Sequence, residues 1–144
     1  MSLPGVPLQI VLAEDNPADV MLVRLALKEA EVHCELHVMD DGDKAFAFIT
    51  ALDADPQSAP IDLLLLDMHL PKRDGEEIVE WLRSTRHHAQ TPVIFMTGSD
   101  AERDHDQAKK HAVLHYFRKP SDFAEFMELG VIIRNLLVAQ PLDE

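Results

Sequence analysis

Residues Leu63 to Gly75 have the sequence LLLLDMHLPKRDG: four consecutive leucines lead to an aspartate, Asp67, where the apolar run stops. An uninterrupted apolar run of strand length is typical of a central strand in a parallel sheet, because helices cover both faces of such a sheet. Alternating apolar and polar residues would instead indicate a sheet with one face in water. The stretch therefore predicts a buried strand that presents the carboxylate of Asp67 at its carboxyl end.

Other apolar runs of strand length recur along the chain, and segments with helical patterns separate them. The first helix has the clearest start, because Asn16 can cap it and Pro17 loses no hydrogen bond at the first helical position. Alternation of strands and helices predicts a parallel sheet between two helical layers. We expect a flavodoxin-like, doubly wound α/β fold with strand order 2-1-3-4-5. The strands are expected at 8–13, 34–39, 61–67, 92–97 and 114–119, and the later helices at 42–51, 75–84, 101–111 and 121–138.

The composition excludes several classes of protein. A chain of 144 residues that is 47% hydrophobic can form one domain with a single core. Its formal net charge of −13 repels phosphate backbones and anionic lipids, so we expect neither nucleic acid nor membrane as a direct partner. The lone cysteine, Cys34, excludes an internal disulfide and argues against a zinc cluster.

We expect neither a membrane span nor a signal peptide. No run approaches the ~20 apolar residues that span a bilayer, and the N-terminus lacks the basic and long apolar regions of a signal peptide. We therefore expect a cytoplasmic protein with an irregular segment at 1–7, one domain at 8–139 and an acidic tail at 140–144. These limits leave no room for a separate output domain, so output should pass through protein contacts.

Polar side chains follow four of the expected strands. Glu14 and Asp15 follow the first strand, Asp67 ends the third, Thr97 ends the fourth and Lys119 ends the fifth. The carboxyl ends of parallel strands share one edge of the sheet, where open α/β sheets bind ligands. Close carboxylates repel each other by up to ~4 kcal/mol per pair at an effective dielectric constant of about 20. A hard cation such as Mg²⁺, which prefers oxygen ligands, is the expected counter-charge.

Four segments, VLAEDN, LLLLDMHLPKRDG, FMTGS and YFRKP, resemble in this order the marker segments of response-regulator receiver domains of the CheY type. The resemblance covers residues 8–139. It implies that Asp67 accepts a phosphoryl group from a histidine kinase or a phosphotransfer protein, with Mg²⁺ or Mn²⁺ as cofactor. It implies a signalling protein with slow autodephosphorylation and not an enzyme. The NPADV after the acidic pair, the extended segment before the third strand and LPKRDG look most like the single-domain regulators that are paired with phytochrome-type kinases.

The same resemblance implies a role for each matched residue. Asp15 would ligate the metal directly, Glu14 would act through a metal-bound water, and the backbone carbonyl of His69 would complete the protein ligands. Lys119 would bind one phosphoryl oxygen, and Thr97 would donate its hydroxyl to another. These roles match the chemical requirements of phosphoryl transfer, which depends on in-line positioning of the reacting groups and on neutralising the charge of the equatorial oxygens.

A conformational switch is also implied. Tyr116 matches the switch aromatic of the family, whose ring swings inward when Thr97 moves toward the phosphate. Phosphorylation of Asp67 would thus alter the surface around 101–111. The resemblance further implies a cis peptide bond before Pro120.

Two other functions fit part of the pattern. A phosphatase of the haloacid-dehalogenase type also places an aspartate after an apolar strand, but it needs a second aspartate where this chain has His69. A receiver-fold interaction module that never takes phosphate predicts a damaged pocket, whereas every expected acidic, hydroxyl and amine position is filled here. His69 and Ser99 depart from the residues common in the family, so the dephosphorylation rate is open.

The last expected helix, within SDFAEFMELGVIIRNLLVAQ, carries apolar residues on two faces. At 100° per residue, one apolar stripe should pack on the sheet: Phe123, Phe126, Gly130, Ile133 and Leu137. Leu129, Ile132 and Leu136 point away from this stripe. Because one apolar face suffices to cover a sheet, we expect these three residues to form a two-fold homodimer interface. Neighbouring helices of the same subunit are the alternative cover.

Overall fold

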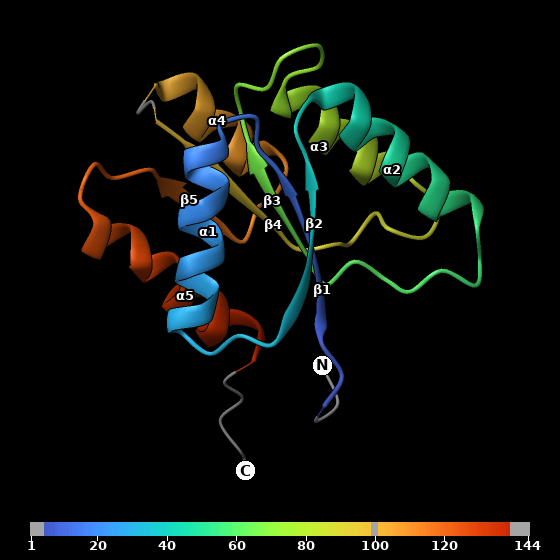
Figure 1. The fold of residues 1–144 in the computed structure, drawn as a ribbon. Helices are drawn as coiled ribbons and strands as arrows, with labels where there is room; N and C mark the ends of the chain where they lie inside the picture. The colour runs from blue at the N-terminus through green and yellow to red at the C-terminus, as the bar shows by residue number, and fades with distance from the viewer. Residues whose placement is uncertain (1–4, 99–100, 139–144) are drawn as a thin grey trace.

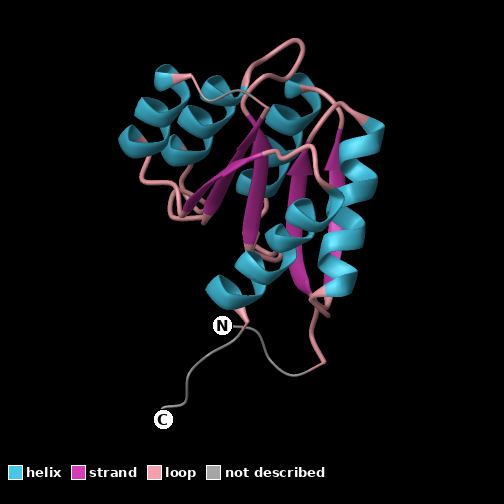
Figure 2. Cartoon of the chain, turned by 90° about the vertical axis from the view of Figure 1, so that its left-hand side faces the viewer, coloured by secondary structure: helices cyan, strands magenta, loops and turns pink. Residues whose placement is uncertain are grey.

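The computed structural model describes residues 5–98 and 101–138 and shows a parallel sheet between two layers of helices (Figure 1, Figure 2). The strand order, β2-β1-β3-β4-β5, is the predicted one. The predicted fold class is therefore confirmed. The strands of the described chain are β1 (Leu8–Ala13), β2 (Cys34–Met39), β3 (Leu63–Asp67), β4 (Val93–Thr97) and β5 (His115–Arg118), and the helices are α1 (Pro17–Glu29), α2 (Gly42–Ala54), α3 (Gly75–Ser84), α4 (Glu102–Lys110) and α5 (Phe123–Leu137).

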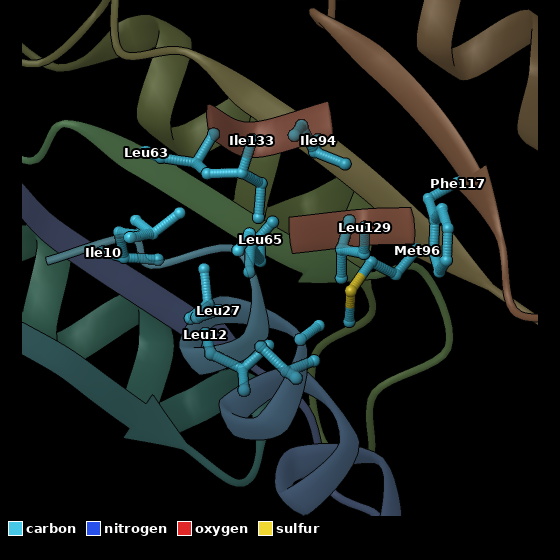
Figure 3. Close-up of a cluster of buried hydrophobic side chains, with 14 of the residues drawn as sticks. Ile10, Leu12, Leu27, Leu63, Leu65, Ile94, Met96, Phe117, Leu129 and Ile133 are labelled. Atoms are coloured by element: carbon cyan, nitrogen blue, oxygen red, sulfur yellow. The ribbon is translucent and has the colours of Figure 1, made fainter. Parts of the chain in front are cut away.

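The central strand β3 is buried along its whole length between β1 and β4. Its side chains alternate between two cores: Leu65 belongs to the core under α1 and α5, and Leu64 to the core under α2, α3 and α4. Figure 3 shows Leu65 between Leu27 of α1 and Leu129 of α5. Burial on both faces explains why the strand carries leucine at consecutive positions.

Local sequence signals fix most helix ends. The side chain of Asn16 accepts a hydrogen bond from the backbone N–H of Ala18 and caps α1, as predicted. Helix α2 continues to Ala54, three residues beyond its predicted end at Ala51. It stops there because Asp55 precedes Pro56, and the residue before a proline is disfavoured in helical geometry.

Helix α5 packs on α1 as well as on the sheet, so a neighbouring helix, the alternative to a second subunit, covers part of its second apolar face. Its buried side is the set Phe126, Leu129, Gly130 and Ile133. Leu129 is 0% exposed, so its predicted position on an outward face was wrong. Phe123 is 57% exposed at the start of the helix, so its predicted place in the core was also wrong. A helix with two packing partners buries a wider sector than a helix on one sheet face, and this sector includes Leu129.

The peptide bond before Pro120 is trans, since no bond within residues 5–98 and 101–138 is cis. The cis bond implied by the family resemblance was therefore wrong for this structure. A trans bond is the ordinary state even before proline, where it is favoured by about 0.5–1 kcal/mol.

The regular elements of the described chain run from Leu8 to Leu137. The predicted acidic tail at 140–144 and Ser99 lie outside the described residues. The division of the chain into 1–7, 8–139 and 140–144 stays a prediction. Among the described helices, none has the length and apolar character needed to cross a membrane.

Candidate functional site

Three carboxylates meet at the carboxyl ends of β1 and β3. Glu14 and Asp15 follow β1 directly, and Asp67 is the last residue of β3. The parallel register pairs Ala13 with Leu66, so the two strand ends lie side by side. One ligand oxygen from each of the three acids lies within 4.8 Å of the others. The topology of the sheet thus creates the acidic cluster that the sequence predicted.

Lys119 follows β5 and reaches into this cluster. Its Nζ lies 2.7 Å from Glu14 Oε1, 2.9 Å from Asp19 Oδ2 and 3.2 Å from Asp67 Oδ2. Asp19 was not predicted as a site residue. Its position in the first turn of α1, a helix that starts at the same edge of the sheet, is the signal that could have identified it. The ammonium group therefore joins acids from three different parts of the chain.

Burial governs the charge state of the cluster. Glu14 is 1% exposed. Desolvation, opposed by the contact with Lys119 and reinforced by the charge of Asp67, raises the pKa of Glu14 to about 7. Burial alone would lower the pKa of Lys119, but the contacts with Glu14 and Asp19 and the charge of Asp67 outweigh it and raise that pKa. Lys119 is therefore charged at neutral pH, whereas Glu14 titrates near it.

The ligand atoms of this site fit a hard divalent cation. The cluster offers carboxylate oxygens only, which are the ligands that Mg²⁺ and Mn²⁺ prefer. Asp15 is exposed, whereas Asp67 is buried at 6% exposure, so the cluster meets solvent at Asp15. Glu14 Oε1 is buried and accepts no aligned hydrogen bond within the described part of the chain, although Lys119 Nζ lies close to it. Such an oxygen can accept a hydrogen bond from a metal-bound water.

Thr97 ends β4, next to Asp67 in the sheet, and is 0% exposed. Its hydroxyl donates a hydrogen bond of 3.3 Å to Asp104 Oδ2 of α4. The same carboxylate oxygen lies 3.1 Å from His69 Nε2. The backbone N–H of His69 in turn donates to Asp67 Oδ1 at 2.9 Å. The sequence does not identify Asp104 as a site residue, because no local pattern distinguishes it from the other charged residues of α4.

Tyr116 is half-buried on β5 and contacts α4. Its ring stacks on the ring of His105, with the centroids 4.0 Å apart and the planes at 19°. Tyr116 and Thr97, the two predicted switch residues, therefore contact adjacent residues of the same helix, His105 and Asp104.

The loop between β3 and α3 is fixed against α2. The backbone N–H of Gly42 donates to the carbonyl of Pro71 at 3.0 Å. A Cβ atom at Gly42 would overlap the carbonyl oxygen of Arg73, so only glycine permits this approach. Arg73 Nε also lies 2.9 Å from Asp43 Oδ1. The loop that carries His69 is thus held in place beside Asp67.

The site brings together five of the predicted residues: Glu14, Asp15, Asp67, Thr97 and Lys119. His69, which was also predicted, lies in the loop beside Asp67, where its backbone N–H donates to Asp67 Oδ1. Tyr116 is beside α4, and Leu129 belongs to the core.

Comparison with known proteins identifies the family. The family model described as "Response regulator receiver domain" matches residues 10–129. The response regulator Rcp1 of Synechocystis sp. is 36% identical over 98 residues, which are 68% of this chain and 67% of that protein.

Two solved structures share the architecture. The phosphorylated cyanobacterial phytochrome response regulator RcpA superposes with a TM-score of 0.83 at 28% identity, over 96% of this chain and 100% of that one. The Mn²⁺-bound form of response regulator Rcp1 gives a TM-score of 0.81 at 29% identity, with the same coverage. By sequence, fold and the arrangement of its acidic site, this chain belongs to the response regulator receiver domain family.

Proposed function

We propose that this protein relays signals in a two-component system by accepting a phosphoryl group on Asp67. The observation that carries the proposal is the environment of that carboxylate. One of its oxygens lies within 4.8 Å of ligand oxygens of Glu14 and Asp15, and its Oδ2 lies 3.2 Å from Lys119 Nζ. This arrangement combines a nucleophile, a cation site and a fixed ammonium group, as phosphoryl transfer requires.

In the proposed reaction, a carboxylate oxygen of Asp67 attacks the phosphorus atom of a phosphohistidine. The bond between phosphorus and the imidazole nitrogen breaks, and the imidazole leaves with a proton from solvent. Lys119 binds one equatorial oxygen during this step, and Thr97 donates its hydroxyl to another once the acyl phosphate has formed. The donor is a sensor histidine kinase or a phosphotransfer protein.

The cation site has ligands of two kinds in this proposal. Asp15, Asp67 and the backbone carbonyl of His69 would hold the ion directly, and Glu14 would hold it through water. A bound Mg²⁺ or Mn²⁺ supplies positive charge to the phosphoryl oxygens. The solved Mn²⁺-bound form of Rcp1, a similar protein, supports this choice of ions.

The proposed partners follow from the relatives and from the surface. Similar proteins are described as phytochrome response regulators, so we assign a phytochrome-type histidine kinase as the phosphoryl donor. The net charge of −13 disfavours nucleic acid and membrane surfaces as direct partners. We place the protein in the cytoplasm, where its lone cysteine would remain reduced.

A homodimer through α5 is part of the same proposal, with a changed interface. Ile132 is half-buried and Leu136 is 40% exposed, so both can contact a second copy. Val131, which is 51% exposed, lies on the same helix. Leu129 cannot contribute, because it is buried within the subunit. Output would then depend on protein contacts around α5 and around Tyr116.

Incubation with acetyl phosphate tests the function. We expect the intact mass to increase by one phosphoryl group in Mg²⁺ and not in EDTA. Slow loss of that group from the isolated protein would measure autodephosphorylation. A protein that stays unmodified in Mg²⁺ with both acetyl phosphate and a phytochrome-type kinase would instead favour an interaction module that works without phosphorylation.

A further inference from the structure

Asp104 is a buried carboxylate in a very polar helix. It is 4% exposed, whereas Glu102 and Asp106 of the same helix are exposed. A buried carboxylate is costly unless it is hydrogen-bonded or paired. Asp104 Oδ2 meets this need through two contacts, 3.3 Å from the hydroxyl of Thr97 and 3.1 Å from His69 Nε2.

The bond between Thr97 and Asp104 competes with the proposed role of Thr97. A threonine hydroxyl carries one proton and can donate one hydrogen bond at a time. While that proton lies on Asp104 Oδ2, it is not available to a phosphoryl oxygen on Asp67. Phosphorylation must therefore break this bond before Thr97 can bind the phosphoryl group.

His69 links Asp104 to Asp67, the proposed phosphoryl acceptor. His69 donates its backbone N–H to Asp67 Oδ1, and its ring contacts Asp104. The next residue of α4, His105, stacks on Tyr116. Two adjacent side chains of α4, Asp104 and His105, thus contact the two switch residues. Asp104 also contacts the ring of His69 in the loop after Asp67.

We propose that Asp104 is a positioning residue that holds Thr97 in its unphosphorylated arrangement and so opposes the phosphorylated one. The proposal rests on the function proposed above for Asp67. It predicts that loss of the Asp104 carboxylate favours the arrangement in which Thr97 binds a phosphoryl oxygen. One hydrogen bond corresponds to a change of about three- to tenfold in an equilibrium constant.

Titration with beryllofluoride, a phosphoryl mimic, in saturating Mg²⁺ tests this proposal. Fluorine NMR detects the bound fluorides directly and requires no reporter residue. We expect the Kd for beryllofluoride to fall about three- to tenfold in Asp104→Ala and by less in Asp104→Asn, whose amide oxygen can still accept from Thr97. The exposed neighbour supplies the control, and Asp106→Ala should leave this Kd unchanged.

Variants of Thr97 distinguish an effect of Asp104 through the Thr97 hydroxyl from an effect of its negative charge alone. Removing an acid near the site could tighten anion binding through electrostatics alone, and an acid in the first turn of a helix also stabilises that helix. If Asp104 acts through the hydroxyl, Asp104→Ala should change the Kd in wild type and in Thr97→Ser but not in Thr97→Ala. An equal change in the Thr97→Ala background would overturn the proposal.

Two further outcomes are distinguishable. If wild type binds beryllofluoride and Asp104→Ala and Asp104→Asn both bind it with the wild-type Kd, this inference is wrong and the proposed function stands. If wild type does not bind beryllofluoride in Mg²⁺, the proposed function fails and the inference fails with it.

Discussion

At the scale of single residues, the site concentrates negative charge around one cation. Glu14, Asp19 and Asp67 share the ammonium group of Lys119, while Asp15 stays in solvent. Carboxylates this close repel each other, and one ammonium group neutralises only part of their charge. Such an arrangement is expected to reduce stability until a divalent cation binds, as functional sites often do.

The titration of Glu14 gives a pH-dependent prediction for the metal-free protein. The folded protein holds the pKa of this acid at about 7, compared with its ordinary value of 4.5. Between these values the folded state binds more protons at Glu14 than the unfolded state does, so this contribution to stability is present below pH 4.5 and is lost as the pH rises to about 7. The full loss is up to about 3 kcal/mol.

Urea unfolding in EDTA at several pH values measures this effect. Other acids also titrate, so the informative quantity is the difference between wild type and Glu14→Gln, which cannot ionise at this position. We expect Glu14→Gln to gain stability relative to wild type as the pH rises. A difference that does not vary between pH 4.5 and 7 would contradict the assigned pKa.

Asp15 provides a second test of the shared cation site. Asp15→Asn removes an exposed charge from the cluster and should raise the melting temperature in EDTA while it weakens Mg²⁺ binding. Asp40→Asn, which neutralises an exposed acid paired with Lys44, is the matched control and should leave Mg²⁺ binding unchanged. A lower melting temperature in EDTA together with unchanged Mg²⁺ affinity would argue against the shared site.

Site residues at strand ends could be predicted from the sequence, because the order and direction of the strands fix where they meet. Asp67 and Thr97 are examples of this rule. Asp104 could not be assigned in the same way, since its role depends on how helix α4 is rotated above the sheet edge. That rotation results from packing across the whole core and leaves no local trace in the sequence.

At the scale of helices and strands, the sequence predicted β3 well and α5 poorly. The run from Leu63 to Leu66 is apolar at every position, which only burial on both faces explains. The apolar positions of α5 allow more than one buried face, and contact with α1 decides between them. Gly130 marks that contact, because a Cβ atom there would overlap the carbonyl oxygen of Ala26.

Gly130→Ala tests the close packing of α5 on α1. In an exposed helix, this change would stabilise the protein by about 1 kcal/mol through helix propensity. Here the overlap with the backbone of α1 should outweigh propensity and reduce the unfolding free energy by about 1–3 kcal/mol. Chemical denaturation measures the change, and Asn135→Ala at an exposed position of α5 is the control. A Gly130→Ala protein more stable than wild type would show that the helices can separate at no cost.

At the scale of the whole molecule, the prediction is a homodimer that forms through helix α5. Ile132 and Leu136 are the residues of the predicted interface that the subunit leaves accessible. We expect wild type with beryllofluoride bound to sediment as a dimer at tens of micromolar and Ile132→Glu to sediment as a monomer. Val6→Glu introduces the same charge at another exposed apolar site and should remain dimeric. A monomeric wild type, or a dimeric Ile132→Glu, would remove this interface.

Chemical mapping of the phosphoryl group tests the central claim most directly. An acyl phosphate is reduced by borohydride to an alcohol, so a phosphorylated aspartate becomes homoserine and can be located by tandem mass spectrometry. After treatment with acetyl phosphate and Mg²⁺, we predict homoserine at position 67 alone and none in Asp67→Asn. Homoserine at Asp15 or another aspartate, or an acid-stable phosphoryl group on any residue, would contradict the assignment of Asp67 as the acceptor.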